Sequence, residues 1–183
     1  MATPGDRRLE FEYGHATFVQ RAVLLFALWV LVTILFASLA QVDVVWVIVI
    51  SAAVGAYAVV FGISPLLTQH WLTRSRLILR QGWYFRAILP LREVRSIRPY
   101  DGAAKVGLRG DLARGTLYVT GSKVGLVDLE LATPRRFWQV LFVLADHVVF
   151  DVTSRDRFLE AAQSRAGLLA PVKADRAETD LRY

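Results

Sequence analysis

Two long apolar runs dominate the pattern of hydrophobic and polar positions along the chain. Residues 22–40 form a run of 19 residues without a charged side chain, and residues 44–63 form a second such run. A helix rises about 1.5 Å per residue, so the first run covers roughly 28 Å, close to the hydrocarbon thickness of about 30 Å. Only residues 41–43 separate the runs, and Ser64-Pro65 ends the second. The pattern predicts a two-helix transmembrane hairpin over residues 22–65.

Two other interpretations of the runs are a helical hairpin buried in a soluble core and a cleaved signal peptide. A chain of 183 residues has little other sequence with which to cover about 40 apolar residues on all sides. Residues 37–40 (ASLA) resemble a cleavage site, but the first run is longer than a usual signal-peptide core and a second run follows at once. The hydropathy pattern therefore favours a membrane hairpin.

Small residues recur along the second run at a spacing of three to four positions. Such residues allow close approach of helices in membranes, which predicts a helix-packing edge formed by Ser51, Gly55, Ala58 and Gly62. Neither run contains an ionisable residue, which argues against a transporter or a channel. The hairpin is expected to be an anchor, a lateral docking surface, or both.

Basic residues lie on one side of the predicted hairpin. The segment between the runs has none, whereas the N-terminal segment and the residues after the second run carry many arginines. The positive-inside rule then places both termini in the cytoplasm, as in a multi-pass protein of the inner (cytoplasmic) membrane. The net charge of +6 suggests contact with anionic lipid head groups before any contact with nucleic acid. The hypothetical head-group contacts are Arg21, Arg74, Arg76, Arg80 and Arg86.

Alternating apolar and polar positions replace the apolar pattern after the hairpin. The alternation predicts strands over residues 71–81, 83–89, 94–97, 116–120 and 124–131, with a glycine-rich loop over 101–114. Thr133-Pro134 is typical of a helix start, but residues 137–145 fit either a helix or a buried strand. A short amphipathic helix is expected over residues 156–165.

This pattern divides the chain into four segments. They are a cytoplasmic N-terminal tail (1–21), the transmembrane hairpin (22–65), a cytoplasmic domain (66–167) and a C-terminal tail (168–183). The expected fold class is a membrane α-hairpin followed by an α+β domain of mostly antiparallel strands, closed by a C-terminal helix.

Two stretches of the domain resemble the bacterial pleckstrin-homology-like membrane proteins. LTRSRLILRQGWYFRAILPLREVRSI (residues 72–97) is similar to the opening hairpin of that family, and VDLELATP with VVFDVTSRDRFLEAA (within residues 127–162) is similar to its closing strand and helix. The resemblance implies a PH-like domain and no particular ligand, because this fold carries many binding functions.

Candidate chemistry is sparse. The chain has no cysteine, and His15, His70 and His147 have no metal-ligand spacing. His70 is expected at the membrane interface, His147 in a turn, and the carboxylates of Asp128 and Glu130 in solvent. The basic loop over residues 102–115 could bind an anion. A solvated loop between strands is favoured, because no helix N-terminus follows this segment. The sequence therefore predicts no enzyme activity, no metal and no cofactor.

These observations favour a non-catalytic, membrane-anchored accessory or assembly subunit that binds a larger membrane protein complex. The aromatic side chains proposed to dock the partner are Phe137, Trp138 and Phe142. The alternative is a protein that binds anionic lipid or senses envelope stress on its own. Nucleic-acid binding is not expected, since the basic residues are not interleaved with a stacking platform.

Overall fold

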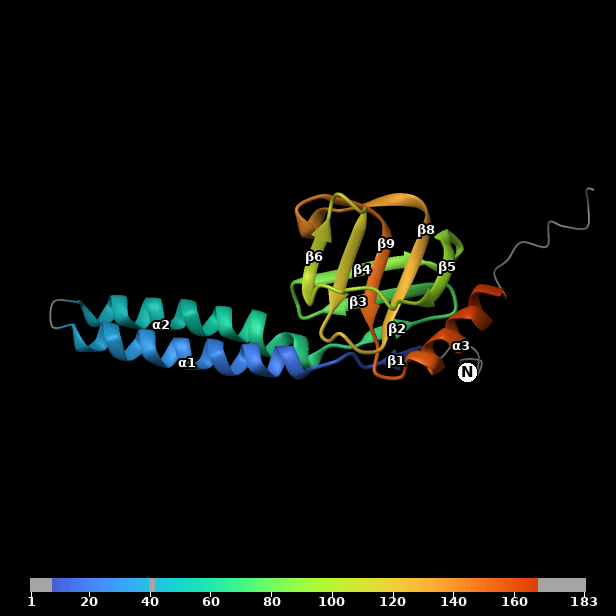
Figure 1. The fold of residues 1–183 in the computed structure, drawn as a ribbon. Helices are drawn as coiled ribbons and strands as arrows, with labels where there is room; N and C mark the ends of the chain where they lie inside the picture. The colour runs from blue at the N-terminus through green and yellow to red at the C-terminus, as the bar shows by residue number, and fades with distance from the viewer. Residues whose placement is uncertain (1–7, 40–41, 168–183) are drawn as a thin grey trace, which may run out of the picture.

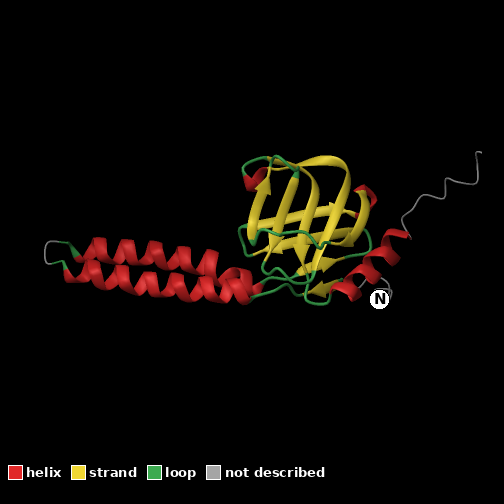
Figure 2. Cartoon of the chain, in the orientation of Figure 1, coloured by secondary structure: helices red, strands yellow, loops and turns green. Residues whose placement is uncertain are grey.

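Two long helices extend side by side from one side of a β domain (Figures 1 and 2). The computed structural model describes residues 8–39 and 42–167. The first helix is α1 (Ala16–Ser38). The second is α2 (Val44–Ala58), which continues through a π-helical turn, η2 (Val59–Ile63), and a 3-10 turn, η3 (Ser64–Leu67). Both helices are long and apolar enough to cross a membrane, and almost none of their apolar surface is buried.

An aspartate and a proline mark the two ends of the second helix. The Asp43 carboxylate accepts a hydrogen bond from the Val45 backbone N–H at 2.9 Å and so caps the start of α2. At the other end the backbone hydrogen bonds change from the α-helical to the π-helical pattern in η2, and Pro65 lies in the first turn of η3. The helix therefore ends where the proline was expected to end it.

The first sheet contains four antiparallel strands in the order β1-β2-β3-β4. They are β1 (Leu9–Phe11), β2 (His70–Leu72), β3 (Arg76–Gln81) and β4 (Phe85–Pro90). The prediction of one strand over residues 71–81 is wrong, because Thr73 closes a turn by bonding both the N–H and the C=O of Arg76. The chain therefore reverses between β2 and β3, which pair with each other.

The N-terminal segment belongs to this sheet. Leu9 pairs with Leu72, and Phe11, which is 5% exposed, pairs with His70 and packs in the core. The prediction of an N-terminal tail over residues 1–21 therefore does not hold for Leu9–Phe11. A three-residue strand whose partner lies beyond the hairpin gives no local periodic signal, and this explains the difference.

The second sheet contains five strands in the order β5-β8-β9-β7-β6. They are β5 (Val94–Pro99), β6 (Gly107–Asp111), β7 (Thr116–Thr120), β8 (Leu126–Phe137) and β9 (Val143–Asp151). β7 and β9 run parallel, and the other neighbours are antiparallel. The expected loop over residues 101–114 therefore contains a strand, β6.

Residues 137–145, for which the sequence fitted either a helix or a buried strand, connect two paired strands. Residues 137–145 include the end of β8, a 3-10 turn η5 (Trp138–Val140) and the start of β9. Thr133-Pro134 does not begin a helix, because it lies within β8 where the pairing with β9 shifts register. Proline is tolerated there because no regular ladder bond is lost.

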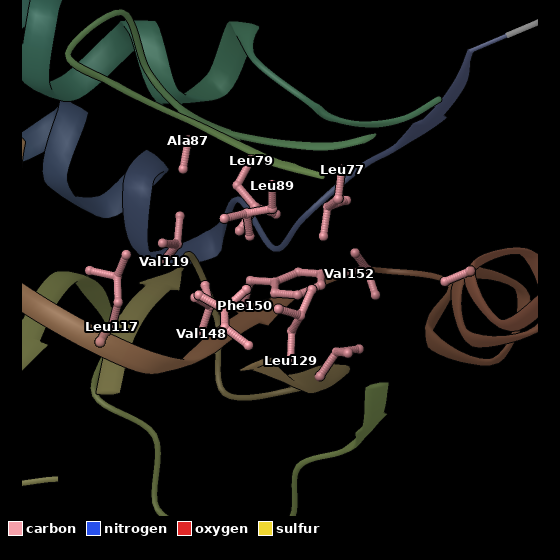
Figure 3. Packing of buried hydrophobic residues seen from close by; sticks show 14 of the residues in the cluster. Leu77, Leu79, Ala87, Leu89, Leu117, Val119, Leu129, Val148, Phe150 and Val152 are labelled. Carbon is pink, nitrogen blue, oxygen red and sulfur yellow. The ribbon is translucent and has the colours of Figure 1, made fainter. Parts of the chain in front are cut away.

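The two sheets face each other across one core (Figure 3). Leu77, Leu79 and Leu89 of the first sheet pack with Leu129, Val148 and Phe150 of the second. The helix α3 (Arg155–Gly167) closes one end of the core through Phe158 and Ala162, both fully buried. A mostly antiparallel β domain with a closing C-terminal helix agrees in outline with the expected fold class.

Candidate functional site

A buried carboxylate joins the base of the hairpin to the second sheet. Asp151, at the end of β9, is fully buried and accepts hydrogen bonds from the backbone N–H groups of Gly14, Gly121 and Ser122 at 2.8, 2.7 and 3.0 Å. The Ser122 hydroxyl donates a fourth bond at 2.9 Å. Burial raises the pKa of the Asp151 carboxyl above its usual value, and these hydrogen bonds oppose the rise. One side chain at the end of β9 thus holds the segment before α1 against the loop between β7 and β8.

Tyr13 makes a second connection at the same level. Its hydroxyl bonds the Pro65 carbonyl and lies 2.8 Å from the hydroxyl oxygen of Thr68. The Thr68 hydroxyl in turn accepts the Gly82 backbone N–H at 2.9 Å. Burial raises the pKa of Tyr13 to about 12, so the hydroxyl remains a hydrogen-bond donor at neutral pH. The two ends of the hairpin and the β3–β4 turn are therefore bonded to one another.

His70 lies in the core of this junction. Its ring is 1% exposed and stacks on Tyr13 with ring centroids 4.8 Å apart. Its Nδ1 accepts the Arg80 backbone N–H at 3.3 Å, which fixes an unprotonated nitrogen at that position. Burial lowers the pKa of His70 to about 3, so the ring is neutral at physiological pH. The His70 side chain is thus enclosed by protein, and its position relative to a membrane interface stays a prediction.

The hairpin also carries polar groups on its inner side. The Trp29 indole N–H donates to the Ser51 carbonyl at 2.8 Å and lies 3.0 Å from the Ser51 hydroxyl, which is 2.9 Å from the Thr33 hydroxyl. Ser51, named as part of a helix-packing edge, thus bonds α1 of the same chain. Gly55 and Gly62 also face α1, since an added Cβ would lie 3.3 Å from the Trp29 Nε1 and 3.1 Å from the Ala22 Cα respectively.

An open apolar groove of about 630 Å³ runs along the hairpin between its helices. Small side chains of α2 and larger side chains of α1 line it, including Ala52, Ala56, Ala58, Phe26 and Trp29. The predicted packing edge therefore serves both helices of the hairpin, and part of it remains open at the floor of this groove.

The five arginines proposed to contact lipid do not form one patch. Arg74 lies in the β2–β3 turn and Arg76 opposite Pro90, at the end of β3 away from the Gly82 turn that is bonded to the hairpin base. Five steps of about 3.3 Å between the six residues of β3 separate its two ends by roughly 17 Å. Arg74 and Arg76 therefore lie away from the hairpin base, and their contact with lipid stays a prediction.

The other three arginines lie nearer the hairpin base. The guanidinium of Arg80 stacks over the Trp71 ring at 4.6 Å, and Arg86 pairs with Arg80 across the β3–β4 hairpin. The Arg21 guanidinium lies beside Gly107, where an added Cβ would be 3.8 Å from Nη2. These three residues remain candidates for contact with lipid head groups.

Three arginines that the sequence did not group together meet near the start of β3, at the end away from the hairpin base. Arg76, Arg92 and Arg135 line a hollow of about 530 Å³ together with Ser75, Ile88 and Pro90. Arg135 donates to the Ile88 carbonyl at 2.8 Å and lies 3.7 Å from the Glu93 carboxylate. Arg135 is 59 residues from Arg76 in sequence, so no local pattern signals that they meet.

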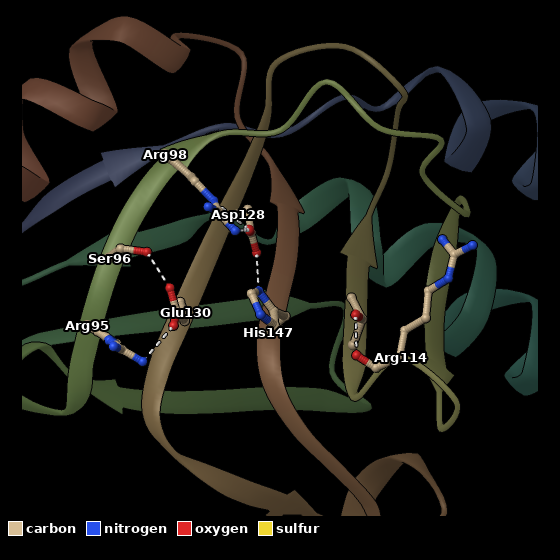
Figure 4. A network of polar contacts seen from close by, with 8 residues as sticks. Arg95, Ser96, Arg98, Arg114, Asp128, Glu130 and His147 are labelled. Atoms are coloured by element: carbon tan, nitrogen blue, oxygen red, sulfur yellow. Dashed lines mark hydrogen bonds and ion pairs between the residues drawn. The ribbon is translucent and has the colours of Figure 1, made fainter.

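A charged network covers the outer face of the second sheet (Figure 4). The Asp128 carboxylate is 5% exposed and is bonded by the Arg98 guanidinium at 3.0 Å and by the His147 Nδ1 at 3.1 Å. Glu130 accepts from the Ser96 hydroxyl at 2.9 Å. The expectation that the Asp128 carboxylate meets solvent is wrong, because it is buried. The expectation that His147 lies in a turn is also wrong, because it lies in β9. Each carboxylate oxygen of Asp128 has a cationic or imidazole partner, which fits a structural network.

Within residues 8–39 and 42–167, no group of three or more His, Cys, Asp or Glu side chains is placed to hold a metal ion. The Asp128–His147 pair borders a hollow of about 270 Å³ that also includes the Tyr118 and Thr116 side chains. Both of those residues are buried, at 1% and 7% exposure. The partly exposed Tyr100 side chain lines the same hollow.

The turn between β8 and β9 exposes large apolar side chains. Trp138, Leu141 and Phe142 are 70%, 92% and 67% exposed, whereas Phe137 is 6% exposed and belongs to the core. Leu141 and Phe142 both have left-handed backbones, with φ of 51° and 59°. Each such residue costs about 1–3 kcal/mol of strain. Two of the three proposed docking residues are thus available on the surface, and Phe137 is not.

No family model, no curated protein and no solved structure matches this chain.

Proposed function

We propose that the chain is a non-catalytic, membrane-anchored accessory subunit that binds a larger membrane protein complex through its hairpin. The supporting observation is the open apolar groove along the hairpin, with small side chains at its floor. Helices in lipid associate by close packing at small residues, because hydrocarbon provides no hydrophobic drive between them. A transmembrane helix of the partner is the occupant that fits a long apolar groove of this kind.

The proposed location is the inner membrane, with both chain ends in the cytoplasm. Two apolar helices with exposed surfaces support a membrane location, and the arginines outside the hairpin support the orientation. The domain would then lie on the cytoplasmic side as a PH-like module. Its two packed sheets and closing helix support that assignment in outline.

The attachment of the hairpin to the domain supports a role in assembly. Asp151 and Tyr13 bond the hairpin base to the domain at several points, so a helix seated in the groove would fix the orientation of the domain as well. A flexible linker would serve a simple anchor equally well. The proposed function is therefore the positioning of the cytoplasmic domain on a membrane partner.

Filling the groove tests this function. Ala56 lines the groove, and Ala53 is exposed on the same helix outside it. Ala56→Phe should remove co-purifying membrane proteins after mild detergent extraction, while Ala53→Phe should retain them, with both variants monodisperse and folded. The readout is the set of proteins that co-purify with the wild type and Ala53→Phe but are lost with Ala56→Phe.

Two outcomes would contradict the proposal. One is a wild-type protein that extracts as a monomer without any partner. The other is a partner retained equally by both phenylalanine variants, which would place the contact outside the groove.

A further inference from the structure

The turn of residues 138–142 is the most exposed apolar part of the β domain. Leu141 is 92% exposed, and Leu112, in the neighbouring β6–β7 turn, is 75% exposed. Single exposed leucines are common on protein surfaces, but a cluster that includes a tryptophan and a phenylalanine marks a contact with something apolar.

The backbone holds these side chains outward. Phe137 and Val143 at the two ends of the turn are buried, and Val143 packs directly against Gly110 of β6. Between them Leu141 and Phe142 adopt consecutive left-handed conformations, which glycine or asparagine would adopt with less strain. Strain that presents apolar side chains to solvent has no benefit for the fold itself, so it points to a function of the turn.

The turn lies on the side of the domain nearest the hairpin. In Figure 1 the short helical turn of residues 138–140, in orange, lies beside the tip of β6, the strand of the second sheet closest to the hairpin. β6 is the edge strand of that sheet, and its first residue, Gly107, lies beside the Arg21 guanidinium of α1. The edge strand thus leads from the hairpin base to the exposed turn.

A second tryptophan marks the same side of the domain. Trp83 is 61% exposed, and its backbone N–H bonds the Ser64 hydroxyl at the end of the second helix. Tryptophan favours the head-group level of a bilayer, where its ring is amphipathic. Exposed Arg136 precedes this turn in β8, and exposed Arg109 lies in β6 next to Gly110, which packs on Val143; both side chains suit anionic head groups.

We propose that Trp138, Leu141 and Phe142 insert into the head-group region of the leaflet from which the hairpin emerges. This inference rests on the proposed membrane location of the hairpin and assigns the lipid surface, not a protein partner, to the turn. The domain then has two membrane contacts, the hairpin base and the turn, at opposite ends of its edge strand. Two separated contacts fix the tilt of the domain on the membrane, which one anchor cannot do.

The absence of cysteine allows a direct depth measurement. Single cysteines at Leu141 and Arg74 can each carry an environment-sensitive fluorophore in the full chain, reconstituted in vesicles of equal parts phosphatidylcholine and phosphatidylglycerol. Lipids spin-labelled near the head group should quench the label at position 141 at least several-fold more than the label at position 74, which lies in the turn at the far end of β3. Equal quenching at the two positions would overturn the inference.

A third label separates this inference from the proposed membrane location. Leu31→Cys lies in the middle of α1 and should be quenched by lipids that carry the spin label deep in the acyl chain. If position 31 is quenched and position 141 remains in water, the hairpin spans the membrane and the turn does not insert. If neither is quenched, the membrane location itself fails.

A double glycine variant tests the strain argument independently. Leu141→Gly with Phe142→Gly should raise the thermal midpoint in detergent, because glycine adopts both backbone conformations without strain. A fluorophore at Gln139→Cys reports on the turn both in the double glycine variant and in the chain with Leu141 and Phe142 intact. Quenching by head-group spin labels should be largely lost in the double glycine variant. A lowered midpoint would mean that the two side chains stabilise the fold, and the inference would be overturned.

Discussion

The hairpin and the β domain have opposite arrangements of polar and apolar side chains. In the hairpin, apolar side chains such as Leu24, Leu31 and Ile34 are each more than 60% exposed, while Trp29 and Ser51 bond each other between the helices. In the domain, leucine and phenylalanine fill the interior and charged networks lie on the outer faces. A single chain therefore contains two surfaces suited to different solvents, hydrocarbon for one and water for the other.

The boundary between these regions carries several buried polar groups. Asp151, Tyr13, Thr68 and His70 all lie within the junction, and all are 2% exposed or less. The Asp151 carboxylate and the hydroxyls of Tyr13 and Thr68 have hydrogen-bond partners, and losing such partners is costly in the interior, so this junction accepts few alternative arrangements. The domain is therefore fixed to the hairpin by specific hydrogen bonds at the boundary between these two unlike regions.

A charge in the middle of α1 should have the largest effect, because it tests whether the exposed surface of the hairpin meets hydrocarbon while that of the domain meets water. Leu31→Asp should raise the apparent free energy of membrane insertion by about 3.5 kcal/mol, since aspartate at a helix centre is strongly disfavoured in hydrocarbon. Glycosylation mapping in microsomes measures the inserted fraction. Val124→Asp, at an 80% exposed position of the domain, should leave insertion unchanged. Equal insertion of Leu31→Asp and wild type would mean that the exposed face of α1 does not meet lipid.

Loss of the Asp151 carboxylate tests the junction. Asp151→Ala leaves the N–H groups of Gly14, Gly121 and Ser122 without their acceptor and should cost about 3 kcal/mol of unfolding free energy. Asp101→Ala, at a carboxylate that is 90% exposed, should change it by less than about 0.5 kcal/mol. Thermal unfolding in detergent and protease sensitivity near residue 14 provide the measurements. Similar stability of the two variants would refute the role of Asp151.

Acid should weaken the junction through His70. The pKa of His70 falls to about 3 in the folded chain, so below pH 6.5 the unfolded chain binds a proton that the folded chain does not. Stability should therefore fall by about 1.4 kcal/mol per pH unit, or roughly 2 kcal/mol between pH 6.5 and pH 5. His70→Leu loses the bond to the Arg80 N–H at every pH but should remove this part of the acid sensitivity. An unchanged pH slope in unfolding experiments would contradict a buried neutral His70.

The smallest expected effect concerns the polar contact inside the hairpin. Trp29→Phe keeps an aromatic ring between the helices but removes the indole N–H that bonds Ser51. Interhelical hydrogen bonds in membranes contribute about 0.6 kcal/mol on average, so only a small loss is expected. Unfolding in mixed micelles, compared with Trp46→Phe on the exposed face of α2, would measure it. A loss of several kcal/mol would show that Trp29 supports more than the helix pair.

Residue patterns predicted the parts of the fold that depend on local sequence. The two apolar runs give the hairpin, and alternation gives most of the core strands, because Leu77, Leu79, Ala87 and Leu89 recur at every second position. Pairing between distant segments overrode local signals elsewhere. Thr133-Pro134 favoured a helix start, but the extended partner β9 holds these residues in β8.

The candidate sites were less predictable. The small residues of α2 were identified from their spacing, yet the sequence could not say that Gly55 and Gly62 face α1 of the same chain. Asp151 appeared as one acid at the end of a strand, because the backbone N–H groups that surround it come from residues 14, 121 and 122 and have no side-chain signature. Exposure of Leu141 likewise depends on a backbone conformation that no periodic pattern encodes.

The pairing of β1 with β2 has a consequence for biosynthesis. Leu9 meets Leu72 across the entire hairpin, so the first sheet cannot be completed until both helices have been synthesised. In the proposed membrane location, the two strands can meet only if the chain enters and leaves the bilayer on the same side. A chain inserted with one crossing would leave β1 stranded across the membrane, with an unpaired edge on β2 and an open core beside Phe158, which packs on Phe11. The β1–β2 pair therefore forms only when both ends of the hairpin lie on the same side, and a fragment that begins after the hairpin lacks the strand that completes the sheet.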